Sequence, residues 1–275
     1  MITTQDIETY ISRIPPTPAI LKKTLAYVKA GDLHKAAACA EEDAALSSYL
    51  KAFVNRPIFG FRSEVTKLSQ IFGILGTAAA QQMLYSYMLS LLSPKEWKLF
   101  QLKKNSFADL QAHLSKSWKD ILKHLAIDDK EIISAISLLP ATIIVCEALF
   151  SNRLEEVTLL RSVKDLDYNT ILKRLTEKDL FDISEMIATK WEFSDNIITI
   201  IHASNGNYKP QDSENPEGIT QNALLGKWMH LLLFYTFSKP EFITAGLNDF
   251  IDFNVEYVGD IYEDFMTIMN ITEES

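Results

Sequence analysis

The chain has 275 residues and a formal net charge of −9, with 47% hydrophobic and 23% charged residues. A chain of this length can bury a substantial core, and the composition is that of a soluble globular protein. Only nine glycines and nine prolines argue against a loop-rich sheet protein, and the many Leu, Ile, Ala, Lys and Glu residues favour helices.

The negative charge is concentrated at the end of the sequence. From Glu241 onward there are nine acidic residues and no Lys or Arg, whereas residues 1–240 carry 27 charges of each sign. Proteins that bind nucleic acid need a concentrated basic surface, because their affinity comes largely from counterion release. We therefore expect no nucleic-acid partner.

The cysteines and the N-terminus indicate the compartment. Cys39 and Cys146 both lie in apolar surroundings, where small buried side chains are expected. The first residues lack the basic region of a signal peptide. The longest uncharged stretch, residues 132–146, is shorter than the roughly 20 residues of a membrane-spanning helix. We expect a cytoplasmic protein without membrane insertion.

The first third of the chain predicts short helices separated by clear breaks. One begins at Thr3 or Thr4 and ends at the prolines, Pro18 opens a second that runs to residue 30, and residues 34–42 form a third. In residues 43–55 the apolar side chains fall at helical spacing, and Asp43 can cap the free amides.

A glycine divides the next helical stretch. Ser63 is expected to cap a helix with an apolar stripe that ends at Leu75, and Gly76 begins a further helix to residue 92. Small alanines follow in its first turns, where they allow a close approach of two helices. A polar link follows at residues 103–106, and two lobes are expected to meet near residues 93–106.

The rest of the chain also predicts helices. The β-branched run 142–145 is interpreted as buried helix, because no partner strand with alternating polarity is present. Ser194 is expected to cap a helix, and residues 204–218 form a long polar loop. The helix after Ser194 carries Ile197, Ile200 and Ile201, and the other expected helices are 107–125, 128–139, 141–149, 154–161, 169–175, 183–191, 222–236 and 254–269. The predicted fold class is all-α.

Three short motifs resemble those of the HDOD domain, the HD-related output domain of bacterial signalling proteins. They are Ile-Pro-Pro-x-Pro at residues 14–18, an Asp-to-Phe-Gly run at 43–60, and a Leu-Gly pair. The motif residues are Pro15, Pro18, Asn55, Phe59, Gly60, Leu75 and Gly76. The resemblance is good over residues 10–92 and looser over 105–270. Ala44 stands where the family usually has Pro, and Arg56 where it usually has Ser.

This resemblance implies one HDOD-like domain over residues 1–275, an HD-related helical bundle in two lobes. The N-terminal lobe is expected at about 1–95, and the degenerate C-terminal HD-like lobe at about 105–275. Enzymes of the HD superfamily hold divalent metal through a His-Asp pair and further ligands. None of the five histidines here is followed by Asp, and by resemblance Pro140 and Ala141 occupy the places of that pair.

The resemblance therefore implies no catalytic residues, no metal and no other cofactor. The expected function is a non-enzymatic signal-transduction module that binds a protein partner. Its surface is expected at the corner of residues 55–61 and in the cleft between the lobes, with Arg56, Trp191 and His202 as candidate residues. Two alternatives stay open: a phosphohydrolase with an unrecognised metal set, and a sensor that holds a lipid-like or nucleotide ligand between the lobes.

Overall fold

The described part of the protein is helical throughout. A computed structural model describes residues 2–13, 18–102, 106–164, 166–191, 193–206, 208, 216–237 and 253–270. Within these ranges every regular element is a helix, which confirms the predicted all-α fold. The first elements are α1 (Thr4–Arg13), α2 (Ala19–Lys29), α3 (Leu33–Glu41), α4 (Ala44–Val54), η1 (Pro57–Phe59) and α5 (Leu68–Leu92).

The remaining helices follow the polar link. They are α6 (Ser106–His124), α7 (Lys130–Ala135), η2 (Ile136–Leu138), α8 (Ala141–Phe150), α9 (Leu154–Lys164), α10 (Tyr168–Thr176), α11 (Leu180–Lys190), α12 (Asp195–Ala203), α13 (Pro216–Phe237), α14 (Val255–Val258), η4 (Gly259–Ile261) and α15 (Tyr262–Ile268). The run 142–145 lies in α8, as predicted. The last expected helix, 254–269, is divided into α14, η4 and α15. The expected polar loop 204–218 is shortened, because α13 already begins at Pro216, and residues 207 and 209–215 lie outside the described ranges.

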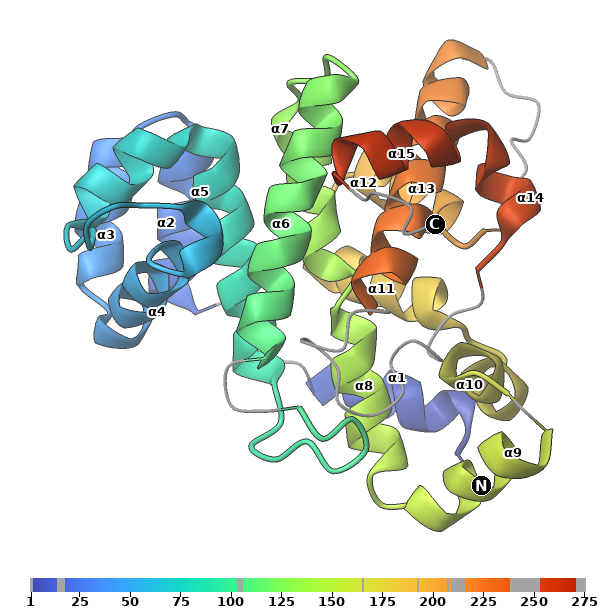
Figure 1. The fold of residues 1–275 in the computed structure, drawn as a ribbon. Coiled ribbons are helices and arrows are strands. Elements are labelled where there is room, and N and C mark those ends of the chain that lie inside the picture. Colours follow the sequence, from blue (N-terminus) through green and yellow to red (C-terminus); the bar gives the residue numbers. More distant parts are fainter. Residues whose placement is uncertain are drawn as a thin grey trace.

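The helices are arranged around two hydrophobic cores. One core belongs to α2–α5, which form the first lobe, drawn in blue and cyan in Figure 1. The other belongs to α7–α15, which with α1 form the second lobe. Ile7 and Ile11 of α1 are buried in the second core, and the Thr4 hydroxyl donates to the Thr176 carbonyl of α10. The structure thus differs from the expected lobe boundary of about 1–95 at α1.

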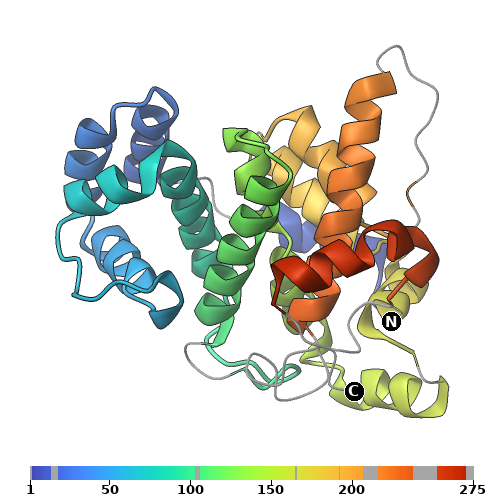
Figure 2. The same ribbon diagram turned by 45° about the horizontal axis from the view of Figure 1, so that its top comes forward.

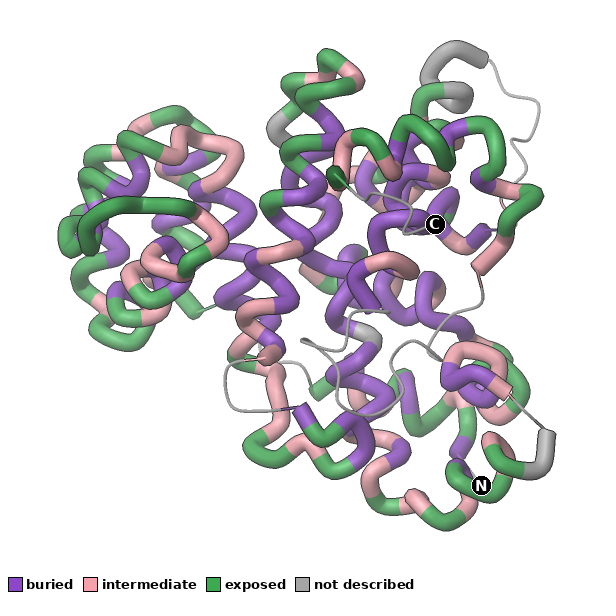
Figure 3. The backbone as a smooth tube through the Cα atoms, in the orientation of Figure 1, coloured by how far each residue is buried: buried purple, intermediate pink, exposed green. Residues whose placement is uncertain are grey.

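Helix α6 separates the two cores and contributes to both. Its large apolar residues, including Leu114, Trp118 and Leu122, belong to the second core, whereas Ala112 belongs to the first. Figures 1 and 2 show α6 between the lobes in both views, and Figure 3 shows its buried central turns. The small side chain of Ala112 fits a helix that must bury a second face against a neighbouring lobe.

Local signals set the corners of the first lobe. The Asp43 carboxylate accepts hydrogen bonds from the backbone N–H groups of Ala45 (2.8 Å) and Leu46 (3.1 Å), which confirms the predicted cap of α4. Gly76 interrupts α5 with φ 75° and ψ 179°, a left-handed φ that only glycine adopts readily. The prediction that Ser63 caps the next helix is wrong, because α5 begins at Leu68 and no side chain caps it.

The second lobe uses one predicted cap residue differently. Ser194 does occupy the position before α12, but its hydroxyl donates to the Glu131 carboxylate of α7 (2.8 Å) and does not cap α12. The prediction that Ser194 caps α12 is therefore wrong. The hydrogen bond from Ser194 to Glu131 instead joins the start of α12 to α7.

A buried carboxylate fixes the link between the lobes. Glu147 of α8 is 1% exposed, and its oxygens accept hydrogen bonds from the backbone N–H groups of Lys98 (2.6 Å), Leu99 (3.0 Å) and Phe100 (3.1 Å). A buried carboxylate needs such partners. Since these bonds occupy its oxygens, Glu147 serves the link and is not available as a metal ligand.

One stretch, Glu131–Phe150, is long and apolar enough to cross a membrane, but 88% of its apolar part is buried inside the fold. Most of its side chains, among them Ile136, Leu139 and Ile143, belong to the second core. Within the fold this stretch forms core helices.

The close approach of α13 to α12 at Gly226 predicts a large effect of one methyl group. A Cβ built at Gly226 of α13 would lie 2.5 Å from the backbone carbonyl atoms of Ala203 in α12. We expect Gly226→Ala to lower the free energy of unfolding by about 1–3 kcal/mol, because the two backbones must separate. Urea denaturation measures this change.

The matched control is Gly73→Ala in α5, where a Cβ would meet nothing within 4 Å. There the substitution should be neutral or stabilising by up to about 1 kcal/mol, since Ala favours a helix. Equal effects at the two positions would contradict the close packing of α12 on α13.

Candidate functional site

The corner after α4 is held by one side chain. The Asn55 amide nitrogen donates to the carbonyls of Lys51 (2.9 Å) and Val65 (2.9 Å), and the Val65 N–H donates to the Asn55 amide oxygen (2.8 Å). Two of these hydrogen bonds join Asn55 to Val65, ten residues further along the chain, and the third anchors the Asn55 side chain to α4. Asn55 therefore has a structural role at this motif position, as the turn chemistry of asparagine allows.

The loop that Asn55 closes presents aromatic side chains. Phe59 of η1 packs against Phe53 of α4, with ring centroids 5.5 Å apart. Gly60 follows with φ 67°, a left-handed conformation that favours glycine and ends η1. Beyond it Phe61 is 37% exposed, and residues 62–64 are also exposed.

Two polar connections join this corner to α6. Arg56 forms an ion pair with Asp109 of α6, and the arginine side chain is only 16% exposed. The Tyr49 hydroxyl donates to the Gln111 side chain (3.3 Å), which in turn donates to the Ser86 carbonyl of α5 (3.1 Å). Burial raises the pKa of Tyr49, so its hydroxyl stays protonated and available as a donor. The corner, α5 and α6 are thus fixed to one another at this end.

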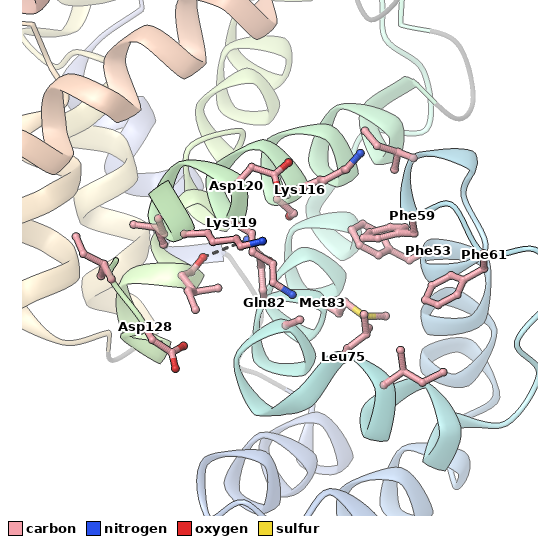
Figure 4. Close-up of a pocket in the computed structure, with 18 of the residues that line it drawn as sticks. Phe53, Phe59, Phe61, Leu75, Gln82, Met83, Lys116, Lys119, Asp120 and Asp128 are labelled. Atoms are coloured by element: carbon pink, nitrogen blue, oxygen red, sulfur yellow. Dashed lines mark hydrogen bonds between the residues drawn. The ribbon is translucent and has the colours of Figure 1, made fainter. Parts of the chain in front are cut away.

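A groove opens between the lobes beside these connections. It has a volume of about 680 Å³ and lies between α4, η1 and α5 on one side and α6, α7 and the turn between them on the other. We call it the inter-lobe groove. Apolar residues of the first lobe line one wall, namely Phe53, Ile58, Phe59, Phe61, Ile74, Leu75, Ala79 and Met83. Figure 4 shows the phenylalanines opposite Lys116 and Lys119 of α6.

Several motif residues meet at this groove. Phe59 and Leu75 line it, Asn55 and Gly60 shape its corner, and Gly76 lies beside Leu75 at the kink of α5. Phe61 belongs to the expected corner 55–61, but the sequence did not single out Ile74, Met83 or the lysines of α6. The only signal for the lysines was their spacing of three and four residues on a predicted helix.

The other candidate residues lie elsewhere. Trp191 packs against both cores, so it does lie at the lobe junction, but it does not line the groove. His202 is on the surface of α12, with Nδ1 3.4 Å from the Glu185 carboxylate. Pro18 is exposed at the start of α2, and Pro15 lies outside the described residues.

The places implied for the His-Asp pair are filled by core residues. Pro140 is buried, and Ala141 is fully buried in the second core. In the part of the chain that the structure describes, no group of three or more His, Cys, Asp or Glu residues is arranged to hold a metal ion. Neither residue at these two places can ligate a metal through its side chain, and the predicted absence of a metal stays a prediction.

A buried histidine, His230, holds the C-terminal helices to α12 and α13. Its Nδ1 lies 3.2 Å from the Ser204 carbonyl, and its Nε2 accepts the Asn254 N–H (3.3 Å). These bonds suit a neutral ring with the proton on Nδ1. A second ring proton, on Nε2, would face the Asn254 N–H and is therefore disfavoured. Burial also disfavours the charged ring and lowers the pKa of His230 below its usual value of 6.5.

The Asn55 bonds predict a measurable loss of stability. Asn55→Ala removes three hydrogen bonds and leaves backbone groups of the loop unpaired. We expect the free energy of unfolding to fall by about 2–3 kcal/mol in urea denaturation. Ser63→Ala, an exposed change in the same loop, should stay within about 0.5 kcal/mol of the original chain. An Asn55→Ala variant as stable as Ser63→Ala would contradict the role of Asn55 in closing the loop.

His230 predicts a pH dependence of stability. Because its pKa is lower in the folded chain, the unfolded chain binds the proton first as pH falls. Stability is therefore greatest above about pH 6.5 and decreases below it. The decrease between about pH 7 and about pH 5 should be smaller in His230→Gln than in the original chain. The exposed His34→Gln should retain the full decrease. An unchanged profile in His230→Gln would contradict this assignment.

Two solved structures share the whole fold. A crystal structure of an HDOD domain protein of unknown function from Geobacter sulfurreducens matches with a TM-score of 0.60 at 12% identity, over 98% of this chain and 96% of that one. A protein from Shewanella amazonensis, described as a candidate phosphohydrolase, matches with a TM-score of 0.56 at 16% identity, over 96% and 97%. At these identities the likeness concerns the fold. No curated protein matches the sequence.

The family follows from the sequence itself. The family model of the HDOD domain matches residues 14–206, which is more than half of the chain. This range contains the Asn55 corner, the Gly76 kink and α6, and thus both walls of the inter-lobe groove. The chain belongs to the HDOD domain family.

Proposed function

We propose that the chain is a non-catalytic output module of a bacterial signalling pathway, which acts in the cytoplasm by binding a protein partner. The observation that carries this proposal is the exposed apolar mouth of the inter-lobe groove. Phe61 is 37% and Ile74 is 53% exposed, and both line the same opening. Adjacent exposed apolar side chains at a cleft are typical of an interaction site.

The arrangement of the corner supports the same proposal. Binding sites favour a surface loop that a rigid scaffold positions. Here the Asn55 bonds close the loop, the Arg56–Asp109 ion pair fixes it to α6, and Phe59 packs on Phe53. A partner that contacts Phe61 and α6 together would touch both lobes and could respond to their relative position.

Loss of the groove mouth should release the partner. We expect that Phe61→Ser combined with Ile74→Ser abolishes retention of the partner by the immobilised chain from an extract of its own organism. Truncated apolar anchors at the centre of an interface commonly cost about 2 kcal/mol or more each. The readout is quantitative mass spectrometry of the retained proteins.

The matched control changes exposed apolar residues away from the groove. Leu91→Ser combined with Leu159→Ser alters side chains that are 45% and 62% exposed and that do not line it. This variant should retain the partner. A partner that the control loses and the groove variant keeps would contradict the proposed surface.

The alternative function is a metal-dependent phosphohydrolase, and the name given to the Shewanella protein is the observation that favours it. Purified chain supplied with Mg²⁺, Mn²⁺ or Ni²⁺ and bis(p-nitrophenyl) phosphate separates the two functions. The proposed module should show no turnover above the metal-only control. Metal-dependent turnover that co-purifies with the chain would favour the enzyme.

A further inference from the structure

The chemistry of the inter-lobe groove divides along its two walls. The wall from the first lobe is apolar apart from Gln82, and it includes Phe53, Phe59 and Met83. The wall from α6 presents Lys116, Lys119 and Lys123, which are spaced by three and four residues and therefore share one face of the helix. A ligand in this groove would meet hydrocarbon on one side and positive charge on the other.

The lysines are open to a ligand. All three are exposed, and within the described ranges none forms an ion pair with an acidic side chain. Two carboxylates, Asp120 and Asp128, also line the groove, so the cations outnumber the anions. In the view of Figure 4, Lys116 and Lys119 lie between Asp128 and the phenylalanines. The positive charge thus borders the apolar wall.

The size of the groove favours a small molecule. Its volume of about 680 Å³ falls within the roughly 300–1,000 Å³ that is usual for small-molecule sites, which are mostly apolar with a few polar groups. A membrane surface fits less well, since the apolar lining lies between two lobes. The other large exposed apolar residues, such as Leu159 and Val255, do not line the groove.

We propose that the inter-lobe groove binds a free anionic amphiphile, with its hydrocarbon chain against Phe53, Phe59 and Met83 and its acidic head group at Lys116, Lys119 and Lys123. Such a ligand touches the first lobe and α6, and Phe61 and Ile74 line the same groove. The ligand is therefore placed to change the mouth of the groove that a partner would contact. Ligand binding itself requires no partner, so this inference can fail or hold independently of the proposed function.

The test is a titration of the full chain with dodecanoate, in which binding is measured by the displacement of the fluorescent probe dansylundecanoate. We expect saturable binding of dodecanoate, weaker binding of dodecanol, and none of dodecyltrimethylammonium. Changing the three lysines together to Glu should weaken dodecanoate roughly tenfold or more. Ala79→Trp, which places a large ring at a lining position, should weaken dodecanoate and dodecanol alike.

The control variant changes three exposed lysines of α2, Lys22, Lys23 and Lys29, to Glu and so alters the net charge equally. It should bind dodecanoate as the original chain does. Circular dichroism establishes that each variant is folded before titration. The proposal is overturned if dodecanoate does not bind, or if the α6 variant and Ala79→Trp both bind it as tightly as the control. A different outcome is that the original chain sediments with phosphatidylglycerol vesicles while the α6 variant does not. That result would assign the site to a membrane lipid and would also overturn the proposal of a free ligand.

Discussion

The architecture depends on helix α6, which contributes to both hydrophobic cores, as α5 does through Leu89. Helix α6 gives its large apolar side chains, such as Leu114 and Trp118, to the second core and the small Ala112 to the first. Beside Ala112 the contacts become polar, with Gln111 bonded to Tyr49 and to the Ser86 carbonyl. A helix with two unequal faces joins the lobes closely at one end and leaves the inter-lobe groove beside that contact.

The features on which the proposed function rests lie at the lobe junction. At the places implied for a metal-binding pair, Pro140 and Ala141 are buried among apolar side chains, and the buried Glu147 serves the link with its hydrogen bonds. The groove combines the exposed Phe61, a closed loop and lysines that form no ion pair within the described ranges. These features support the proposal that the chain acts by being bound, which for the HDOD family is an argument from analogy.

Local chemistry made much of the fold predictable from the sequence. Asp43 caps α4 and Gly76 bends α5 because each effect depends on neighbouring residues only. The prediction of a helix cap at Ser63 was wrong, because the Asn55 side chain is hydrogen-bonded to the backbone of Val65 and α5 begins only at Leu68. The packing of α1 on the second core, the bond from Ser194 to Glu131 and the lysine wall of the groove depend on tertiary contacts that no local pattern encodes.

We place the function of the chain at the junction of the two lobes. Hydrogen–deuterium exchange of the chain, alone and with its captured partner, locates the residues that binding protects. We expect binding to slow exchange in residues 56–67 and in the lysine-bearing turns of α6. Slowed exchange confined to the surroundings of Pro140 and Ala141, with the groove unchanged, would contradict this placement.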